Sequence, residues 1–225
     1  MTPPSSSNAA GQELATPAQH WDRVYTSRAE NVVSWFTPQP STSVGLLDRC
    51  GVNARGAVLD VGGGRSRLVE ALLDRGHRDV TVLEVSAAAL ESSADRLGER
   101  RHDVTWVRAD LLNWAPPRQF EVWHDRAVFH FLTDPADKES YRTVAAAAVV
   151  PGGLLVVGTF AEDGPESCSG LPAARYDAAS LARVFAPDFV SVLAEREVHR
   201  TPGGAEQPFT WVVLRRLDPA TTPPG

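Results

Sequence analysis

Short runs of apolar, mostly β-branched residues alternate with longer stretches of helical spacing over most of this chain. The first kind is typical of strands buried in a sheet, and the second of amphipathic helices. Strand-like runs occupy 56–62, 79–86, 104–110, 120–126 and 154–160, and helical stretches occupy 66–76, 86–101, 138–150 and 177–186. Strands that alternate with helices in this way predict a parallel sheet with helices on both faces.

The end of the chain departs from this alternation. The stretches 189–200 and 208–217 are long and partly alternating, and the segment TPGGAEQ joins them. Such a pair is typical of an antiparallel hairpin. The sequence therefore predicts the α/β class, with a doubly wound seven-stranded sheet that is mostly parallel and ends in a C-terminal antiparallel hairpin.

The two ends of the chain have little to bury. Residues 1–17 and 218–225 are rich in Pro, Ser, Thr and Ala, which is typical of tails that do not join a core. Hydrophobic residues make up 43% of the 225 residues, enough for one core. We therefore expect a single domain over 18–217, whose first part, 18–50, forms an N-terminal cap segment.

Charge and cysteine content bear on the cellular compartment of the protein and on the kinds of partner that it binds. The formal net charge is -6 without a block of Lys and Arg, so no nucleic-acid partner is expected. Apolar runs are too short to span a membrane. Cys50 and Cys168, the only cysteines, lack metal-ligand or CxxC spacing. This cysteine content favours a reducing, cytoplasmic setting, and the core is large enough for a monomer.

The stretch LDVGGGRSRL (59–68) has the glycines of a nucleotide-binding loop at the end of a predicted strand. A dinucleotide loop needs G-x-G-x-x-G, but Arg67 stands at the third glycine position after Gly62 and Gly64. A phosphate-binding P-loop needs a lysine, and none follows. Arg67 also weakens the alternative of a nicotinamide-dependent oxidoreductase.

Acidic residues stand at the ends of three successive predicted strands. Asp60 precedes the glycines, so a carboxylate at the end of the strand is followed by a turn without side chains. Such a surface suits a ligand that has both an ammonium and a carboxylate group. Glu84 ends the second strand, where a carboxylate can accept both hydroxyls of a ribose. Asp110 ends the third and can accept from an adenine amino group, while the Leu111 amide donates to the ring.

This order of acids and glycines resembles class I S-adenosylmethionine-dependent methyltransferases over 21–217, and it implies a Rossmann-like methyltransferase fold. The family's loop reads acid-x-Gly-x-Gly-x-Gly, and Ser66 replaces the last glycine here. The resemblance implies S-adenosylmethionine as the cofactor, with no metal required. The residues that we expect to bind it are Trp21, Tyr25, Trp35, Asp60, Gly62, Gly64, Glu84, Val85, Asp110, Leu111 and His124.

The fourth strand and the residues after it bear on the methyl acceptor. The stretch VWHDRAVFHFLTDPADKESY is similar to the thiopurine and thiol S-methyltransferase group, which has an Asp-Arg-[Gly/Ala] turn and a later tyrosine, here Asp125, Arg126, Ala127 and Tyr141. That group methylates sulfur, selenium or tellurium of small molecules. Protein lysine methyltransferases have a related Asp-Lys-Gly turn. Protein lysine, and an oxygen or nitrogen of a natural product, therefore remain as alternatives.

A thiol acceptor needs little catalytic equipment, because a free thiol with a pKa of about 8.5 is already a few per cent thiolate at neutral pH. We expect Arg126 to stabilise the thiolate and His124 or His130 to take the proton. Asp125 would orient one of these groups, and Tyr25 would hydrogen-bond the acceptor. The alternative is that Arg126 pairs with an acid for support and that His130 packs on the sheet.

Two further segments are expected at the same edge of the sheet. The aromatic residues of 20–41 form either a flap over the cofactor or a helix docked on the core. The loop 161–176, with Cys168 and Arg175, is expected to shape access for the substrate. A subunit that binds the cofactor without catalysis is the non-enzyme alternative.

Overall fold

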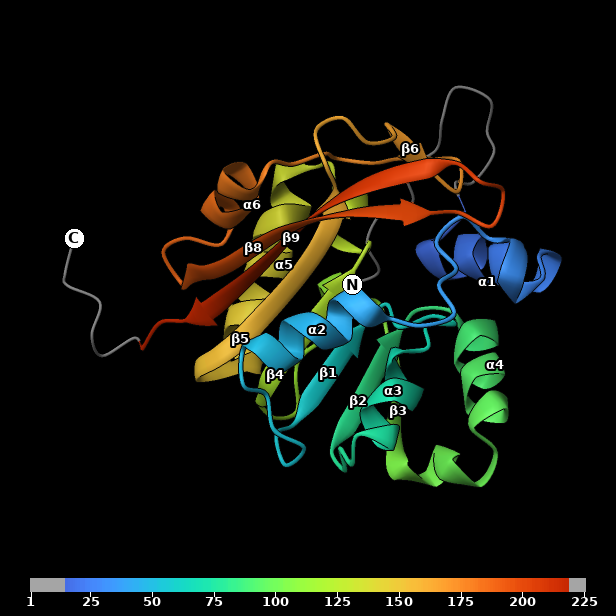
Figure 1. Ribbon diagram of the computed structural model, residues 1–225, viewed down its shortest axis with the longest axis horizontal. Coiled ribbons are helices and arrows are strands. Elements are labelled where there is room, and N and C mark those ends of the chain that lie inside the picture. Colours follow the sequence, from blue (N-terminus) through green and yellow to red (C-terminus); the bar gives the residue numbers. More distant parts are fainter. Residues whose placement is uncertain (1–14, 219–225) are drawn as a thin grey trace, which may run out of the picture.

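The computed structural model describes residues 15–218, so most of the two predicted tails lies outside the described residues. Seven strands form one sheet in the order β3-β2-β1-β4-β5-β9-β8 (Figure 1). The strands of this sheet are β1 (Val58–Val61), β2 (Val80–Glu84), β3 (Val104–Arg108), β4 (Phe120–Arg126), β5 (Val149–Phe160), β8 (Phe189–Arg200) and β9 (Glu206–Arg216).

Six α-helices accompany the sheet within the described residues: α1 (Pro17–Ser27), α2 (Ser41–Arg49), α3 (Leu68–Asp74), α4 (Ala87–Leu97), α5 (Pro135–Ala148) and α6 (Ala178–Val184). Two very short strands, β6 (Ser167–Cys168) and β7 (Leu171–Pro172), pair inside the loop after β5. None of the helices in this part of the chain is long and apolar enough to cross a bilayer.

The pairing of the strands confirms the predicted fold class. β1 pairs in parallel with β2 and β4, whereas β9 pairs antiparallel with β5 and β8. The chain moves outward from β1 to β3 and then returns to the other side of β1 with β4. This reversal places a cleft at the carboxyl ends of β1 and β4, where ligands bind in doubly wound sheets.

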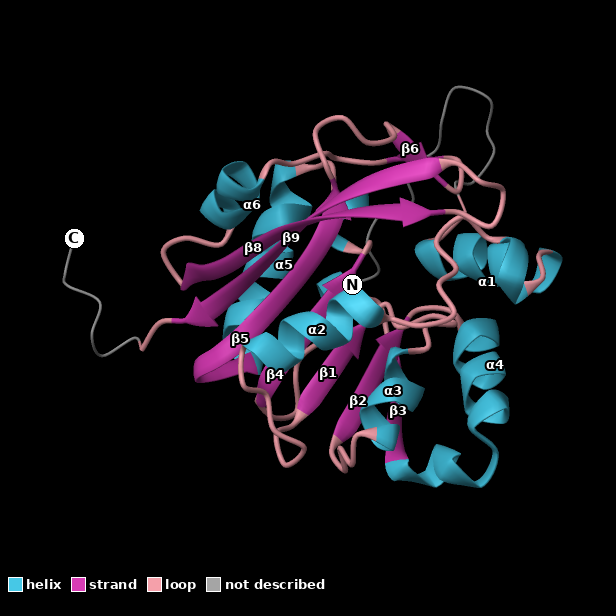
Figure 2. Cartoon of the chain, in the orientation of Figure 1, coloured by secondary structure: helices cyan, strands magenta, loops and turns pink. Residues whose placement is uncertain are grey.

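Two layers of helices cover the sheet (Figure 2). One apolar cluster joins the sheet to α2, α3 and α4, and the other joins it to α5 and α6. β5 supplies Val156 to the first cluster and Val157 to the second, and both side chains are fully buried. A strand covered on both faces needs apolar residues at successive positions, which explains the continuous apolar run in the sequence.

The junction of α5 and β5 differs from the prediction. The predicted helix 138–150 begins three residues late and ends two residues late, because α5 starts at Pro135 and ends at Ala148. Asp134 caps the helix by accepting from the Ala136 N–H at 2.7 Å. Val149 begins β5 directly, since the burial of this apolar residue in the sheet outweighs its helical spacing.

The predicted N-terminal tail also ends earlier than residue 17, because Thr16 and Pro17 begin α1. The Thr16 hydroxyl accepts from the Gln19 N–H, and the Gln19 side chain accepts from the Thr16 N–H. Such a capping box fixes the start of a helix. In Figure 1, α1 lies beyond the carboxyl ends of the parallel strands, next to α4. It is held there by Asp22, whose carboxylate accepts from the Ser86 hydroxyl at 2.6 Å and the Ala88 N–H at 3.2 Å.

Candidate active site

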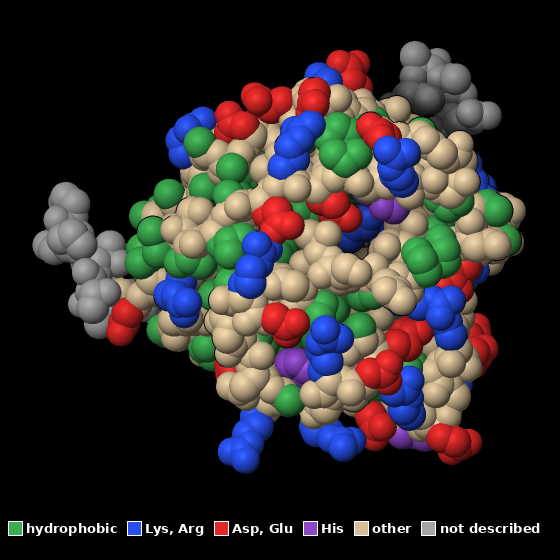
Figure 3. All heavy atoms as spheres, viewed as in Figure 1, with side chains coloured by type: hydrophobic (Ala, Val, Ile, Leu, Met, Phe, Trp, Pro, Cys, Tyr) green, Lys and Arg blue, Asp and Glu red, His purple; other side chains and the backbone are tan. Residues whose placement is uncertain are grey.

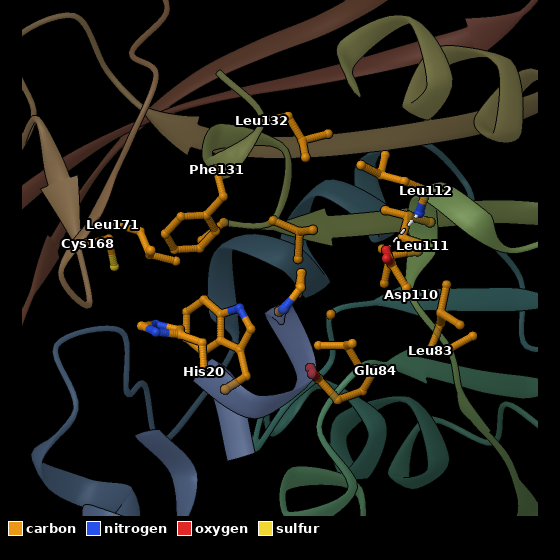
Figure 4. Close-up of a pocket in the computed structure, with 18 of the residues that line it drawn as sticks. His20, Leu83, Glu84, Asp110, Leu111, Leu112, Phe131, Leu132, Cys168 and Leu171 are labelled. Atoms are coloured by element: carbon orange, nitrogen blue, oxygen red, sulfur yellow. Dashed lines mark hydrogen bonds between the residues drawn. The ribbon is translucent and has the colours of Figure 1, made fainter. Parts of the chain in front are cut away.

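A cavity of about 560 Å³ lies between α1 and the carboxyl ends of the parallel strands (Figure 4). Figure 4 shows Asp110, Leu111 and Leu112 together at one end, which we call the Asp110 end. Figure 4 shows His20, Phe131, Cys168 and Leu171 at the opposite end, which we call the His20 end. Trp21 packs on Phe131 and Trp35, and Arg126 bonds the Trp35 carbonyl, so these three lining residues belong to the same end. Glu84 lies between the two ends.

Glycine in the turn after β1 allows the backbone to approach this cavity. Gly62 has a φ of 59°, and a Cβ there would overlap Cγ2 of Val128, which also lines the cavity. Gly64 does not line the main cavity, and a Cβ there would overlap Oη of Tyr25. The turn is therefore packed on both sides, so that a side chain at either position would displace a neighbour.

Replacing Gly62 with Ala should destabilise the protein more than the same change at Gly51. Gly51 has a φ of 71°, but a Cβ there meets nothing within 4 Å. Both changes carry the cost of a positive φ, about 1–2 kcal/mol. Only Gly62→Ala also crowds a packed side chain, which adds about 1–3 kcal/mol. Urea unfolding of the two variants measures the difference, and equal losses would contradict the packing of Val128 on this turn.

Glu84 and Asp110 both reach the cavity, together with Val85 and Leu111 that follow them. Glu84 is only 6% exposed and accepts from the Ser86 N–H at 2.9 Å. Its burial raises the pKa of the Glu84 carboxyl to about 7. The Asp110 carboxylate accepts from the Leu112 N–H at 3.1 Å and from the Asn113 side chain at 2.9 Å. Local hydrogen bonds therefore fix the direction of both carboxylates.

Asp60 and His124 are not in the main cavity. The Asp60 carboxylate lies 2.8 Å from Nδ1 of His124, and Nε2 of His124 lies 2.9 Å from the Ser43 hydroxyl. All three line a second, smaller cavity of about 60 Å³, which shares Tyr25 and Arg126 with the main one. Because both ring nitrogens of His124 are hydrogen-bonded, this imidazole is not available to take a proton from the acceptor.

The aromatic residues of the N-terminal segment meet over the cavity. The Trp21 ring lies 5.2 Å from the Phe131 ring and 6.0 Å from the Trp35 ring, centroid to centroid. Tyr25 lies 6.2 Å from Trp35 and is buried. Its burial, followed by the nearby Glu84 charge, raises the pKa of the Tyr25 phenol well above its ordinary value. These rings both dock α1 and cover the cavity, so the two alternatives for this segment coexist.

Asp125 does not reach the cavity, although the sequence suggested that it would contact the acceptor. Its carboxylate is fully buried and accepts from the Val128 N–H at 2.8 Å, the Phe129 N–H at 3.0 Å and the Tyr141 hydroxyl at 2.6 Å. Burial raises the pKa of Asp125 to about 6. Asp125 therefore shapes the turn after β4 and does not orient Arg126 or a histidine by a direct hydrogen bond.

Arg126, the next residue, does reach the cavity. Its Nη1 donates to the Trp35 carbonyl at 2.9 Å, and its guanidinium lies 5.0 Å from the centroid of the Phe209 ring. Its Nη2 is buried and has no hydrogen-bond partner among the described residues. Burial lowers the pKa of the guanidinium. Arg126 thus places a buried cation with an unpaired N–H group between the two cavities.

His130 lies behind the cavity wall and not in it. Its side chain is fully buried between the rings of Phe131 and Phe160, with centroids 4.3 Å and 4.6 Å away. Burial, and then the charge of Arg126, lowers the pKa of His130 to about 3. A neutral imidazole of such low basicity, without access to the cavity, is a poor proton acceptor, so we drop it from the acceptor site.

The loop after β5 covers the His20 end. Cys168 lines the cavity, and burial raises the pKa of its thiol. Arg175 does not line it, because its guanidinium donates to Glu166 at 2.9 Å and to the Gly164 carbonyl at 3.3 Å. No cluster of side chains suited to a metal ion occurs among the residues that the structure describes.

Sequence reasoning missed His20 as a member of the site. His20 is adjacent to Trp21 in the aromatic segment, and its Nε2 is buried without a hydrogen-bond partner among residues 15–218. The aromatic character of the segment was the available signal. It does not tell which face of a helix lies over the cavity.

The family comparison bears directly on this cavity. Residues 58–153 match the family model described as a methyltransferase domain. That stretch contains the Gly62 turn, Glu84 and Asp110. Over this stretch, which is less than half of the chain, the sequence is similar to a methyltransferase domain.

Solved structures share the fold of this chain. A structure described as "Conversion of a Disulfide Bond into a Thioacetal Group during Echinomycin Biosynthesis" has a TM-score of 0.71 and 22% identity, and the match covers 89% of this chain and 93% of that chain. The 1,6-didemethyltoxoflavin-N1-methyltransferase of Burkholderia thailandensis, with bound S-adenosylhomocysteine, has a TM-score of 0.63 and 23% identity over 87% of this chain and 81% of its own. These likenesses concern the fold alone.

Sequence relatives of the methyltransferase domain are much longer proteins. The eEF1A lysine and N-terminal methyltransferase of Danio rerio is 32% identical over 126 residues, which are 56% of this chain and 18% of that protein. The Homo sapiens protein of the same name is 23% identical over 145 residues, 62% of this chain and 20% of its own. The chain thus spans about one fifth of the length of these relatives.

Proposed function

We propose that the methyltransferase domain transfers the methyl group of S-adenosylmethionine to the sulfur of a small-molecule thiol. The observation that carries this proposal is the chemistry of the His20 end. Its lining is mostly aromatic and aliphatic, and its fixed charge is the cation Arg126. Such a site favours an acceptor that is neutral or anionic over one that bears an ammonium group.

The Asp110 end and the Gly62 turn fit the cofactor. Glu84 provides a buried carboxylate for the ribose hydroxyls, Asp110 accepts from the adenine amino group, and Leu111 presents its backbone beside it. Gly62 leaves space that a Cβ would fill. When bound, the cofactor supplies a methyl group activated by its sulfonium. Tyr25, Trp35, Asp60 and Gly64 lie around the smaller cavity or its turn, toward the amino-acid part.

Arg126 is suited to hold a thiolate. The unpaired Nη2 is a buried cationic donor, and a cation near a thiol lowers the pKa of the thiol and enlarges its thiolate fraction. A buried cationic N–H group without a hydrogen-bond partner is costly, so an anionic acceptor that pairs with it is favoured. The aromatic rings above exclude water, which strengthens this attraction.

The Asp125-Arg126-Ala127 turn resembles that of thiol S-methyltransferases, and its residues have different roles. Asp125 holds the turn from below and Arg126 reaches the cavity. Ala127 has a φ of 70°, a left-handed conformation that favours glycine, which gives a physical reason for the glycine alternative at this position of the turn.

Methylation of a protein lysine or N-terminal amine is the second candidate, favoured by the names of the sequence relatives. Either acceptor is an ammonium before it loses its proton. The cation of Arg126 at the cavity opposes its entry, which is why we rank this candidate second.

One incubation separates these candidates. The pure protein is mixed with S-adenosylmethionine labelled in the methyl group and, separately, with a panel of small thiols or with a cell extract. We expect labelled thioether and S-adenosylhomocysteine with thiols alone. Label in a protein band would favour the second candidate, and cofactor binding without turnover on any acceptor would indicate the non-catalytic subunit.

The proposal includes a monomer in a reducing cytoplasm, without a nucleic-acid partner. Cys50 and Cys168 are both unpaired, which agrees with a reducing setting. On the face shown in Figure 3, acidic and basic side chains are interspersed and form no basic patch.

A further inference from the structure

The His20 end contains two side-chain nitrogens that have no partner. Among the described residues that line the cavity, only Nε2 of His20 and Nη2 of Arg126 are buried side-chain polar atoms without a hydrogen bond. Buried polar atoms are nearly always paired, so such exceptions need a reason. A ligand that occupies the cavity and engages both nitrogens supplies one.

The structure positions His20 by local means. The capping box at Thr16 fixes where α1 begins, and the His20 N–H donates to the Thr16 carbonyl at 2.9 Å in the first turn. The His20 ring then packs edge-on against Trp21, with centroids 5.2 Å apart. In Figure 4 the His20 side chain lies at the same end of the cavity as Phe131, Cys168 and Leu171. The imidazole is therefore held against the wall of the acceptor region.

The other histidines lie outside the main cavity. His77 and His102 precede β2 and β3 and so lie at the opposite ends of these strands. Both ring nitrogens of His124 are hydrogen-bonded. His130 is sealed behind Phe131, and Nε2 of His199 bonds the Ser34 carbonyl at 2.7 Å. His20 is accordingly the histidine with access to a bound acceptor among the residues that line the cavity.

We propose that His20 is the general base of the methyl transfer, acting at Nε2 on the acceptor thiol while Arg126 holds the resulting thiolate. This inference rests on the proposed function. The thiol proton first passes to Nε2 of His20, and the electron pair of the resulting thiolate sulfur then forms the bond to the methyl carbon. The sulfonium–methyl bond breaks in the same step, leaving a thioether and neutral S-adenosylhomocysteine. His20 then returns the proton to water.

Two acceptors that differ in acidity test this role. Phenylmethanethiol is mostly protonated at about pH 8 and needs a base, whereas 4-nitrothiophenol is already a thiolate and needs none. We expect His20→Ala to lower kcat/KM about 100-fold for phenylmethanethiol. For 4-nitrothiophenol we expect a change of less than about threefold, because the proton has already left. His20→Gln keeps a side chain of similar length and should behave as His20→Ala.

His102→Ala is the matched control, since His102 is exposed and lies outside the cavity. It should change neither rate. Calorimetric binding of S-adenosylhomocysteine to each variant shows whether the cofactor site is intact. An equal loss with both acceptors would make His20 a packing residue and overturn the inference, as would an unchanged rate with phenylmethanethiol.

A second measurement does not depend on turnover. The ultraviolet absorbance of bound phenylmethanethiolate is recorded in the complex with S-adenosylhomocysteine. Wild-type protein should show the thiolate and His20→Ala should not. If wild-type protein forms the thiolate and His20→Ala does not, but no methyl group is transferred, the proposed function is refuted and the role of His20 as a base is supported. If wild-type protein is active but both proteins show equal thiolate, only the role of His20 is refuted.

Discussion

Replacing Asp125 with Ala is expected to lower the free energy of unfolding by about 4 kcal/mol. The fully buried carboxylate accepts from two backbone N–H groups, of Val128 and Phe129, and from the Tyr141 hydroxyl. Alanine leaves all three donors unpaired in the core, each at a cost of about 1–3 kcal/mol. Urea unfolding measures the loss, and the thermal midpoint should fall by roughly 10 °C.

Asp134→Ala is the control for this change. The Asp134 carboxylate also accepts from a backbone N–H, that of Ala136 at 2.7 Å, but the residue is exposed. Loss of such an exposed helix cap costs about 1 kcal/mol. If Asp125→Ala cost no more than Asp134→Ala, the turn after β4 would not depend on its buried carboxylate, and neither would the position of Arg126.

Cofactor binding is expected to tighten roughly tenfold between about pH 6 and about pH 8. Burial raises the pKa of Glu84 to about 7, so the carboxyl is mostly neutral at the lower pH. Ribose hydroxyls donate to the ionised form, so binding favours ionisation and is lost as the pH falls through this value. Calorimetry with S-adenosylhomocysteine at several pH values measures the dependence.

Glu84→Gln should weaken binding about 100-fold at the higher pH, because a charged acceptor of two hydrogen bonds is lost. It should also flatten the pH dependence. Glu70→Gln is the control, since Glu70 is similarly sheltered, pairs with Arg96 and does not line the cavity. A pH dependence that survives in Glu84→Gln would assign it to another group and remove Glu84 from the ribose site.

Periodicity alone predicted most of the fold. The run 120–126 is β4 and the run 189–200 is β8, to the residue. Strands buried on both faces have to be apolar throughout, and the edge strand β8 alternates, so the pattern follows from burial. The boundary between α5 and β5 was less well predicted, because Val149 and Val150 satisfy both a helical spacing and a buried strand.

Strand ends likewise predicted which residues meet at and near the Asp110 end of the cavity, which we propose as its cofactor half. Glu84, Asp110 and Gly62 come together because the carboxyl ends of neighbouring parallel strands meet at one edge of the sheet. This adjacency is a property of topology, which the alternation of strands and helices already determines.

The acceptor half was decided only by the tertiary structure. Asp125 and Arg126 are neighbours in the chain, yet one points into the core and the other into the cavity. Both ring nitrogens of His124 are hydrogen-bonded, and His130 is fully buried. His20, in contrast, lines the cavity and comes from a helix more than a hundred residues away in the chain from Arg126. The sequence by itself determined which segments are strands and where their ends lie, because burial and local hydrogen bonding act within each segment. Which side chains share the acceptor site depends on how segments distant in the chain pack against one another, and only the folded structure decides that.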